Sequence, residues 1–243
     1  MNREASWQAL HGAPPLSYGQ VQIWRVPLEQ TPEALARFER CLAPDELARA
    51  DRFRFASDRR RYVVTRAALR ILLGPLLSLD AAAVRFHYGA EGKPSLDAAH
   101  ESNVQFNVAH SHELALVALA RGSALGVDLE YWRELEDAQR IAQRFFSTQE
   151  VAALRATPVA QRQALFFRIW TRKEAFIKAT GRGLSQPLGA FNVLRADGQP
   201  LTCVELDGAT TSWRLWDLFP GARYAAALAW AGRGDAAQYQ FQH

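Results

Sequence analysis

The sequence repeats one order of predicted elements: a long segment with helical periodicity, then a short stretch typical of a β-strand. The first helix is predicted over Asp58–Leu73, where Gly74 and Pro75 are expected to end it, and the second over Arg162–Thr180, ended by Gly181. Strands are expected at Val21–Val26, Val84–His87, Ala115–Ala120, Ala124–Tyr131, Phe191–Leu194, Leu201–Glu205, Trp213–Leu218 and Tyr224–Trp230. Long helices among runs of strands predict an α+β fold in two similar halves, residues 1–120 and 121–243.

Several features predict a cytoplasmic protein without a membrane segment. The longest apolar runs, Leu114–Ala120 and Ala225–Ala231, are too short to span a bilayer. Residues 1–10 contain charges and lack the apolar core of a signal peptide. Cys41 and Cys203 lie far apart in the sequence, so we expect free thiols in a reducing compartment.

The basic residues are mostly arginine. The net charge of +4 is too small to indicate a nucleic-acid binder by itself. Of the 29 basic residues, only Lys93, Lys173 and Lys178 are lysines. Because an ammonium can lose its proton and a guanidinium cannot, these three positions are candidates for a role that requires lysine.

The segment Ala124–Tyr131 alternates apolar residues with polar or small ones, which predicts a half-buried strand. Asp128 and Glu130 then lie on the same face, because side chains two residues apart point the same way. Two neighbouring carboxylates repel each other unless a cation lies near them, and oxygen ligands suit Mg²⁺. The alternative is an ordinary solvated strand face.

Charged residues also interrupt the apolar stripe of the second helix. Lys173 falls on the stripe, Glu174 is next to it, and Lys178 follows Glu174 by one turn. Charged residues are rarely buried unless they are paired or functional. A surface Glu–Lys pair is the alternative for Glu174 and Lys178, but it does not explain Lys173. The face expected to be solvated holds Arg168, Arg172, Ala175 and Ala179.

Three other patterns are weaker. His110 and His112 are expected on one strand face, a spacing that zinc sites also use, although the remaining candidate ligands are carboxylates. Lys93 is presented from a turn made by Gly92 and Pro94. The region of the first helix holds a basic group that could bind phosphate or form a solvated face, and it consists of Arg49, Arg52, Arg54, Arg59, Arg60, Arg61, Arg66 and Arg70.

Four of these motifs occur in an order that resembles the 4′-phosphopantetheinyl transferases. They are G-K-P, F-N-x-x-H-S, G-x-D-x-E and W-x-x-K-E-A-x-x-K, and the resemblance extends roughly from Arg49 to Pro187. The order is most similar to the monomeric type that activates peptide and polyketide synthases. The resemblance implies two halves related by a pseudo-twofold axis, each with a long helix on a mostly antiparallel sheet. It also implies coenzyme A binding by the basic helix and G-K-P loop of the first half and Mg²⁺ chemistry in the second.

The resemblance further implies roles for individual residues. Asp128, Glu130 and Glu174 would hold Mg²⁺ against the coenzyme A pyrophosphate, and Lys178 would assist the leaving group. The reaction also needs a base for the serine hydroxyl, and the candidates are Glu174 and a water bound to Mg²⁺. The other implied coenzyme A contacts are Arg52, Arg61, Arg66, Lys93, Pro94, His110, Ser111 and Lys173. This chain departs from the family pattern at Ala109, where many members have serine, and at His112.

The implied reaction transfers phosphopantetheine from coenzyme A to a serine of an apo carrier protein, an acidic helical domain, and releases adenosine 3′,5′-bisphosphate. The resemblance implies a monomer that binds neither nucleic acid nor membrane. Two other functions stay open from the residues: a metal-dependent phosphohydrolase using the same carboxylates, and a non-catalytic binder of acidic partners or RNA. The second alternative would use the basic helix with Phe53, Phe55 and Tyr62.

Overall fold

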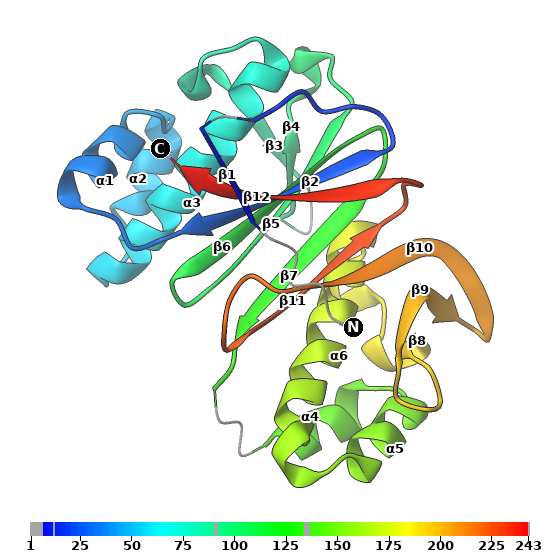
Figure 1. Ribbon diagram of the computed structural model, residues 1–243. Helices are drawn as coiled ribbons and strands as arrows, with labels where there is room; N and C mark the ends of the chain where they lie inside the picture. The colour runs from blue at the N-terminus through cyan, green and yellow to red at the C-terminus, as the bar shows by residue number, and fades with distance from the viewer. Residues whose placement is uncertain (1–6, 12, 90–91, 134–136, 243) are drawn as a thin grey trace. The chain divides into compact units, whose positions relative to one another are not determined.

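The computed structural model describes residues 7–11, 13–89, 92–133 and 137–242 (Figure 1). The chain divides into two compact units, which we describe separately. The N-terminal unit contains residues 5–106, 110–122 and 234–243, and the C-terminal unit contains residues 107–109 and 123–233. Among the described helices, none combines the length and apolar character needed to cross a bilayer.

The N-terminal unit combines a mixed sheet with one long helix and several short ones. The sheet has the strand order β1-β12-β2-β6-β5, in which β12 runs parallel to both β1 and β2, and β2 pairs antiparallel with β6. Its elements are β1 (Gln8–His11), β2 (Gln20–Pro27), α1 (Pro32–Glu39), α2 (Pro44–Ala50), α3 (Ala56–Leu77), β3 (Phe86–Tyr88), β4 (Pro94–Leu96), β5 (Val104–Ser111), β6 (Leu114–Arg121) and β12 (Asp235–Gln242), with 3₁₀ turns at Ala81–Ala83 and Ala98–His100.

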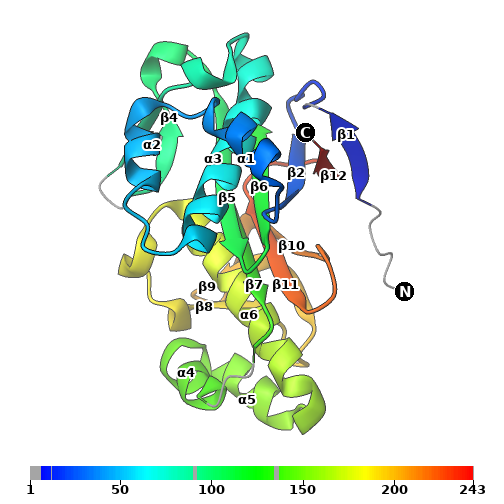
Figure 2. The same ribbon diagram turned by 90° about the vertical axis from the view of Figure 1, so that its left-hand side faces the viewer.

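The C-terminal unit has an antiparallel sheet against which its long helix packs (Figure 2). The strand order is β7-β11-β10-β9-β8, and α6 contacts both β7 and β11. Its elements are β7 (Leu125–Tyr131), α4 (Ala138–Phe145), α5 (Thr148–Ala156), α6 (Val159–Thr180), β8 (Phe191–Leu194), β9 (Pro200–Leu206), β10 (Ala209–Leu218) and β11 (Tyr224–Trp230), with 3₁₀ turns at Gly183–Ser185 and Leu188–Ala190.

The α+β class is confirmed, since each unit combines a 22-residue helix with a five-stranded sheet. β8 and β11 have the predicted bounds, whereas the strand predicted to start at Val84 starts at Phe86. The predicted halves differ from the observed units at the end of the chain. Strand β12 lies in the sheet of the N-terminal unit, although the prediction placed residues 121–243 together.

Helix α3 does not end at Gly74 and Pro75 as predicted. It continues to Leu77 and ends at Ser78, whose φ of 57° is left-handed. A proline lacks one backbone hydrogen bond, but it can lie in a last turn whose geometry the cap maintains. Here the Leu79 N–H donates to the Gly74 carbonyl, and a Cβ on Gly74 would lie 2.7 Å from the Leu79 oxygen. Gly74 therefore allows the chain to turn back closely over the helix end.

The backbone of α6 lies directly on β7 at Gly126. A Cβ at this position would lie 2.2 Å from the Ala175 oxygen and 2.3 Å from the Ala179 nitrogen. Ala175 and Ala179 are buried, so the helix face that was expected to be solvated packs on the sheet. The small residues on both elements allow this approach.

A buried glutamate connects three parts of the C-terminal unit. Glu150 is fully buried and accepts hydrogen bonds from the Ser147 N–H at 3.0 Å and the Val193 N–H at 2.9 Å. Its carboxylate also lies 2.8 Å from the Lys173 ammonium, which is equally buried. Glu150 thus links the start of α5, strand β8 and helix α6.

The N-terminal unit contains the same arrangement. Glu46 accepts a hydrogen bond from the Ala43 N–H at the start of α2 and pairs with Arg66 and Arg70 of α3. Arg70 and Lys173 are each the fifteenth residue of a 22-residue helix, and each donates to carbonyls of the segment that follows its helix. The repeat seen in the sequence therefore extends to buried ion pairs.

We expect Gly126→Ala to destabilise the protein by about 1–3 kcal/mol or more, because the added methyl group overlaps the α6 backbone. Urea denaturation followed by circular dichroism measures the effect. Gly189→Ala is the control, because a Cβ there would have no atom nearer than 3.5 Å. Equal stability of the two variants would show that α6 does not approach β7 this closely.

We expect Lys173→Met to lower the free energy of unfolding by about 3–5 kcal/mol, because it leaves the buried charge of Glu150 without its cation. Arg168→Met is the control on the same helix. Arg168 is 39% exposed and lies 3.4 Å from Asp217, so its loss should cost about 0–1 kcal/mol. A wild-type unfolding curve for Lys173→Met would contradict the buried ion pair.

Candidate active site

Strand β7 presents Gly126, Asp128 and Glu130 on the face that meets α6. Gly126 contacts the helix backbone, and Asp128 Oδ1 lies 2.6 Å from the Lys178 ammonium. Glu130 lies near the side chain of Trp170 on α6, which opposes the rise in its pKa. The predicted shared face is therefore observed, but it is covered by a helix, and Asp128 is only 5% exposed. The alternative of a solvated strand face is wrong for Asp128.

Helix α6 directs its charged residues to two different sides. Lys173 faces Glu150, whereas Lys178 faces Asp128. Glu174 is half-buried and close enough to Asp128 and Lys178 for both charges to act on it. Adjacent residues diverge in this way because successive positions on a helix are about 100° apart.

The carboxylates on this face are electrostatically coupled. Burial raises the pKa of Glu130, and the negative charge of Asp128 raises it further. Burial likewise raises the pKa of Glu174, with Asp128 again adding to the shift and Lys178 opposing it. Asp128 therefore acts on both glutamates, and nearby positive charge would favour the ionised form of each glutamate.

The donor set fits a divalent cation. Asp128 Oδ2 is buried and has no hydrogen-bond partner, and an unpartnered buried oxygen is costly without a ligand. Hard cations such as Mg²⁺ take carboxylate oxygens of this kind. Within the described part of the chain, no group of three His, Cys, Asp or Glu side chains is already arranged to hold a metal. The set of cation ligands therefore remains a prediction, and it consists of Asp128, Glu130 and Glu174.

The structure adds two neighbours of the acidic face that sequence reasoning missed. Asn107 is buried, and its Oδ1 accepts a hydrogen bond of 2.9 Å from the Val127 N–H, next to Asp128. Trp170 lies near Glu130 and stacks on Phe166 with ring centroids 6.1 Å apart. Both residues belong to motifs already noted, F-N-x-x-H-S and W-x-x-K-E-A-x-x-K, which were a usable signal.

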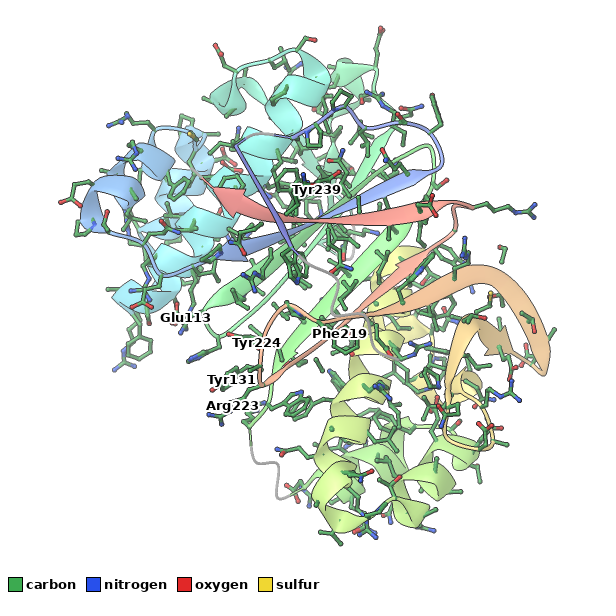
Figure 3. All side chains as sticks on the ribbon, viewed as in Figure 1. Glu113, Tyr131, Phe219, Arg223, Tyr224 and Tyr239 are labelled. Atoms are coloured by element: carbon green, nitrogen blue, oxygen red, sulfur yellow. The ribbon has the colours of Figure 1, made fainter. Side chains whose placement is uncertain are left out.

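An aromatic cluster follows the acidic residues at the end of β7. Tyr131 and Tyr224 meet edge to face with ring centroids 5.1 Å apart, and the Arg223 guanidinium lies 5.1 Å from the Tyr131 ring centroid (Figure 3). The Trp132 N–H donates to the Arg223 carbonyl at 2.7 Å. These contacts fix the strand end that follows Glu130.

Lys173 does not match its predicted contact with phosphate. Its ammonium has three hydrogens, and it lies 2.8 Å from Glu150, 2.7 Å from the Leu188 oxygen and 2.6 Å from the Phe191 oxygen. The side chain is fully buried, and burial lowers its pKa while Glu150 opposes that shift. The predicted phosphate contact is therefore corrected to a structural ion pair.

Many arginines of α3 also have acidic partners within the N-terminal unit. Arg66 is nearly buried between Glu46 and Tyr88, and its guanidinium lies 4.1 Å from the Phe86 ring centroid. This placement conflicts with its predicted contact with the 3′-phosphate. Arg61 pairs with Asp58 and with Glu113 at the turn between β5 and β6. The other paired arginines are Arg59, Arg60 and Arg70.

Other predicted contacts lie nearer the surface of the N-terminal unit. Arg52 is exposed and lines an open depression of about 560 Å³ with Asp45, Arg49 and Phe53. Lys93 precedes Pro94, the first residue of β4, and burial lowers the Lys93 pKa. Glu91 of the same motif lies outside the described residues.

The predicted pair of histidines on one strand face is wrong. His110 is exposed and lies in β5, whose last residue is Ser111. His112 follows the strand in the turn to β6, with a left-handed φ of 53°. The chain turns at His112, so the alternation of a strand does not apply to it.

Comparisons with known proteins cover both units. Residues 124–229 match the family described as the 4′-phosphopantetheinyl transferase superfamily, and residues 27–122 match the one described as 4′-phosphopantetheinyl transferase, N-terminal. The 4′-phosphopantetheinyl transferase HetI of Nostoc sp. is 41% identical over 216 residues, which are 88% of this chain and 89% of the relative. The 4′-phosphopantetheinyl transferase Sfp of Bacillus subtilis is 30% identical over 206 residues, which are 84% of this chain and 88% of the relative. The chain therefore belongs to the 4′-phosphopantetheinyl transferase superfamily.

Proposed function

We propose that the protein transfers the phosphopantetheine arm of coenzyme A to a serine of an apo carrier protein, with Mg²⁺ and release of adenosine 3′,5′-bisphosphate. Relatives named for this activity match most of the chain. The observation that carries the proposal is the acidic face of β7 opposite α6, where Asp128 lies 2.6 Å from Lys178 and has an unpartnered oxygen.

Asp128, Glu130 and Glu174 are the residues we expect to hold the cation. When bound, Mg²⁺ supplies positive charge that offsets the negative charge of the coenzyme A pyrophosphate. Trp170 of α6 lies near Glu130, and the burial of Asp128 excludes water from its carboxylate. A partly dry site strengthens such charge interactions.

Glu174 is the candidate base and Lys178 the candidate partner of the leaving group. The serine oxygen forms a bond to the phosphorus that carries the pantetheine arm, while the bond from that phosphorus to the bridging oxygen breaks. The serine proton passes to Glu174, directly or through a water, and adenosine 3′,5′-bisphosphate departs. Burial raises the pKa of Glu174, which favours proton acceptance, whereas a bound cation would lower it, so a water held by the cation is the alternative base. The Lys178 ammonium offsets the charge that develops on the departing phosphate.

We assign the rest of coenzyme A to residues of the N-terminal unit. Arg52 is exposed and cationic, which suits a phosphate, while Lys93 and Pro94 are candidates for contacts beside the adenine. His110 and Ser111 at the end of β5 are candidates for phosphate contacts. Arg61 is a further candidate, although it would have to share its guanidinium with Glu113 and Asp58.

The proposed partner is an acidic helical carrier domain. The chain has a net charge of +4, so opposite charge on the carrier would favour encounter. We further propose that the protein acts as a monomer in the cytoplasm and binds neither nucleic acid nor membrane.

We expect EDTA to abolish transfer to an apo carrier protein and added Mg²⁺ to restore it. Mg²⁺ should also raise the melting temperature of the wild type, because a ligand that binds only the native state stabilises it, by about 2.7 kcal/mol at 100 times Kd. Asp128→Asn should lose this shift, whereas Asp197→Asn, an exposed acid of the same unit, should keep it. Transfer at full rate in metal-free buffer would show that the reaction does not require a divalent cation.

We expect Glu174→Gln to lower turnover by ~100-fold or more, the range of general-base loss, with little change in melting temperature. The base must be deprotonated, so the wild-type rate should fall at low pH; burial raises the Glu174 pKa above its ordinary value, and a bound cation would oppose that shift. Mass spectrometry of the carrier at a series of pH values measures both effects. An unchanged turnover in Glu174→Gln would leave Glu174 as a structural partner of Lys178.

A further inference from the structure

We propose that Asn107 is a positioning residue, which fixes the backbone of β7 so that Asp128 keeps the geometry needed to bind the cation. The inference rests on the proposed function, because it concerns the affinity of the same acidic site. Asn107 is buried, and its side-chain oxygen accepts the hydrogen bond from Val127, the residue that precedes Asp128.

The position of β7 in its sheet explains why an extra anchor matters. β7 is the edge strand of the order β7-β11-β10-β9-β8, so β11 pairs with it on one side only. Asp128 is opposite Ala227, and Val127 is opposite Leu228. Backbone groups on the other edge of β7 need partners from outside this sheet, since buried N–H groups are nearly always paired. Asn107 supplies that partner next to Asp128.

Two contacts then limit the movement of the strand at consecutive residues. Gly126 lies so close to α6 that a Cβ would be 2.2 Å from the Ala175 oxygen, which prevents movement towards the helix. On the other edge of β7, the Asn107 side-chain oxygen accepts a hydrogen bond of 2.9 Å from the Val127 N–H. Asp128 follows directly, with one oxygen at 2.6 Å from Lys178 and the other without a partner. A shift of Val127 would therefore move the carboxylate relative to Glu174 and Lys178 on α6.

This role differs from that of an ordinary buried hydrogen bond. A bond that only stabilises the fold should affect the melting temperature and leave the cation affinity of the folded protein unchanged. A bond that orients a metal ligand should weaken the affinity itself, and the loss of such supporting contacts typically costs about 10–100-fold in metal binding.

The test measures the dissociation constant of Mn²⁺, used as the probe, by electron paramagnetic resonance well below the melting temperature. We expect Asn107→Ala to raise this constant by ~10-fold or more. Asn107→Asp keeps an oxygen that can accept from Val127, and its added negative charge favours a cation, so its constant should not rise above that of the wild type. Thr211→Val is the control, because it removes side-chain hydrogen bonds elsewhere in the same unit, one donated to the Val204 carbonyl at 2.9 Å and one accepted from the Trp213 N–H at 3.2 Å.

The outcomes separate the inference from the proposed function. Equal Mn²⁺ affinity of the wild type and Asn107→Ala, with loss of binding in Asp128→Asn, would overturn the positioning role and keep the metal site. Wild-type protein that binds no Mn²⁺ would refute the metal site and the inference with it. An equal loss of affinity in Thr211→Val would show a general effect of stability and overturn the inference. If Asn107→Ala fails to fold, Asn107→Thr, which shortens the side chain but fills the space, is measured in its place.

Discussion

The close contact between α6 and β7 determines where the charged residues of the C-terminal unit can lie. At Gly126 the helix backbone occupies the space that any side chain would need, so β7 and α6 are nearer than ordinary side chains allow. Asp128 and Glu130 follow at intervals of two on the same strand face, and Glu174 and Lys178 follow at an interval of four on the helix. The glycine of G-x-D-x-E is thus a packing requirement, and the carboxylates meet the helix because of it.

Each unit also stabilises its long helix with a buried acid from a preceding short helix. Glu46 pairs with Arg66 and Arg70, and Glu150 pairs with Lys173. A buried ion pair adds little net stability, but loss of one partner is costly because the other charge stays buried. Since Lys173 serves this purpose, Lys178 is the lysine of α6 available to the acidic face, where it meets Asp128.

The sequence was sufficient for features that depend on local pattern. Both long helices, strands β8 and β11, and the shared face of Asp128 and Glu130 follow from periodicity and from stop residues such as Gly181. Features that depend on distant partners were missed. The pairing of Arg66 with Glu46 spans 20 residues, and β12 pairs with β2 from the opposite end of the chain. The parallel position of β12 and the burial of Lys173 were missed because only tertiary contacts decide them.

The raised pKa values on the acidic face show why a cation would stabilise this arrangement. Glu130 and Glu174 both bind protons more readily in the folded state than as ordinary carboxyls, because burial and the charge of Asp128 disfavour their ionised forms. Such groups favour folding at low pH, and this contribution is lost as the pH rises through their folded-state pKa values. At higher pH the ionised face therefore opposes folding unless positive charge offsets it. Lys178 provides one such charge at Asp128 Oδ1, while Asp128 Oδ2 has no partner. A divalent cation would relieve the remaining repulsion and, in doing so, would create the positive site to which a pyrophosphate can bind.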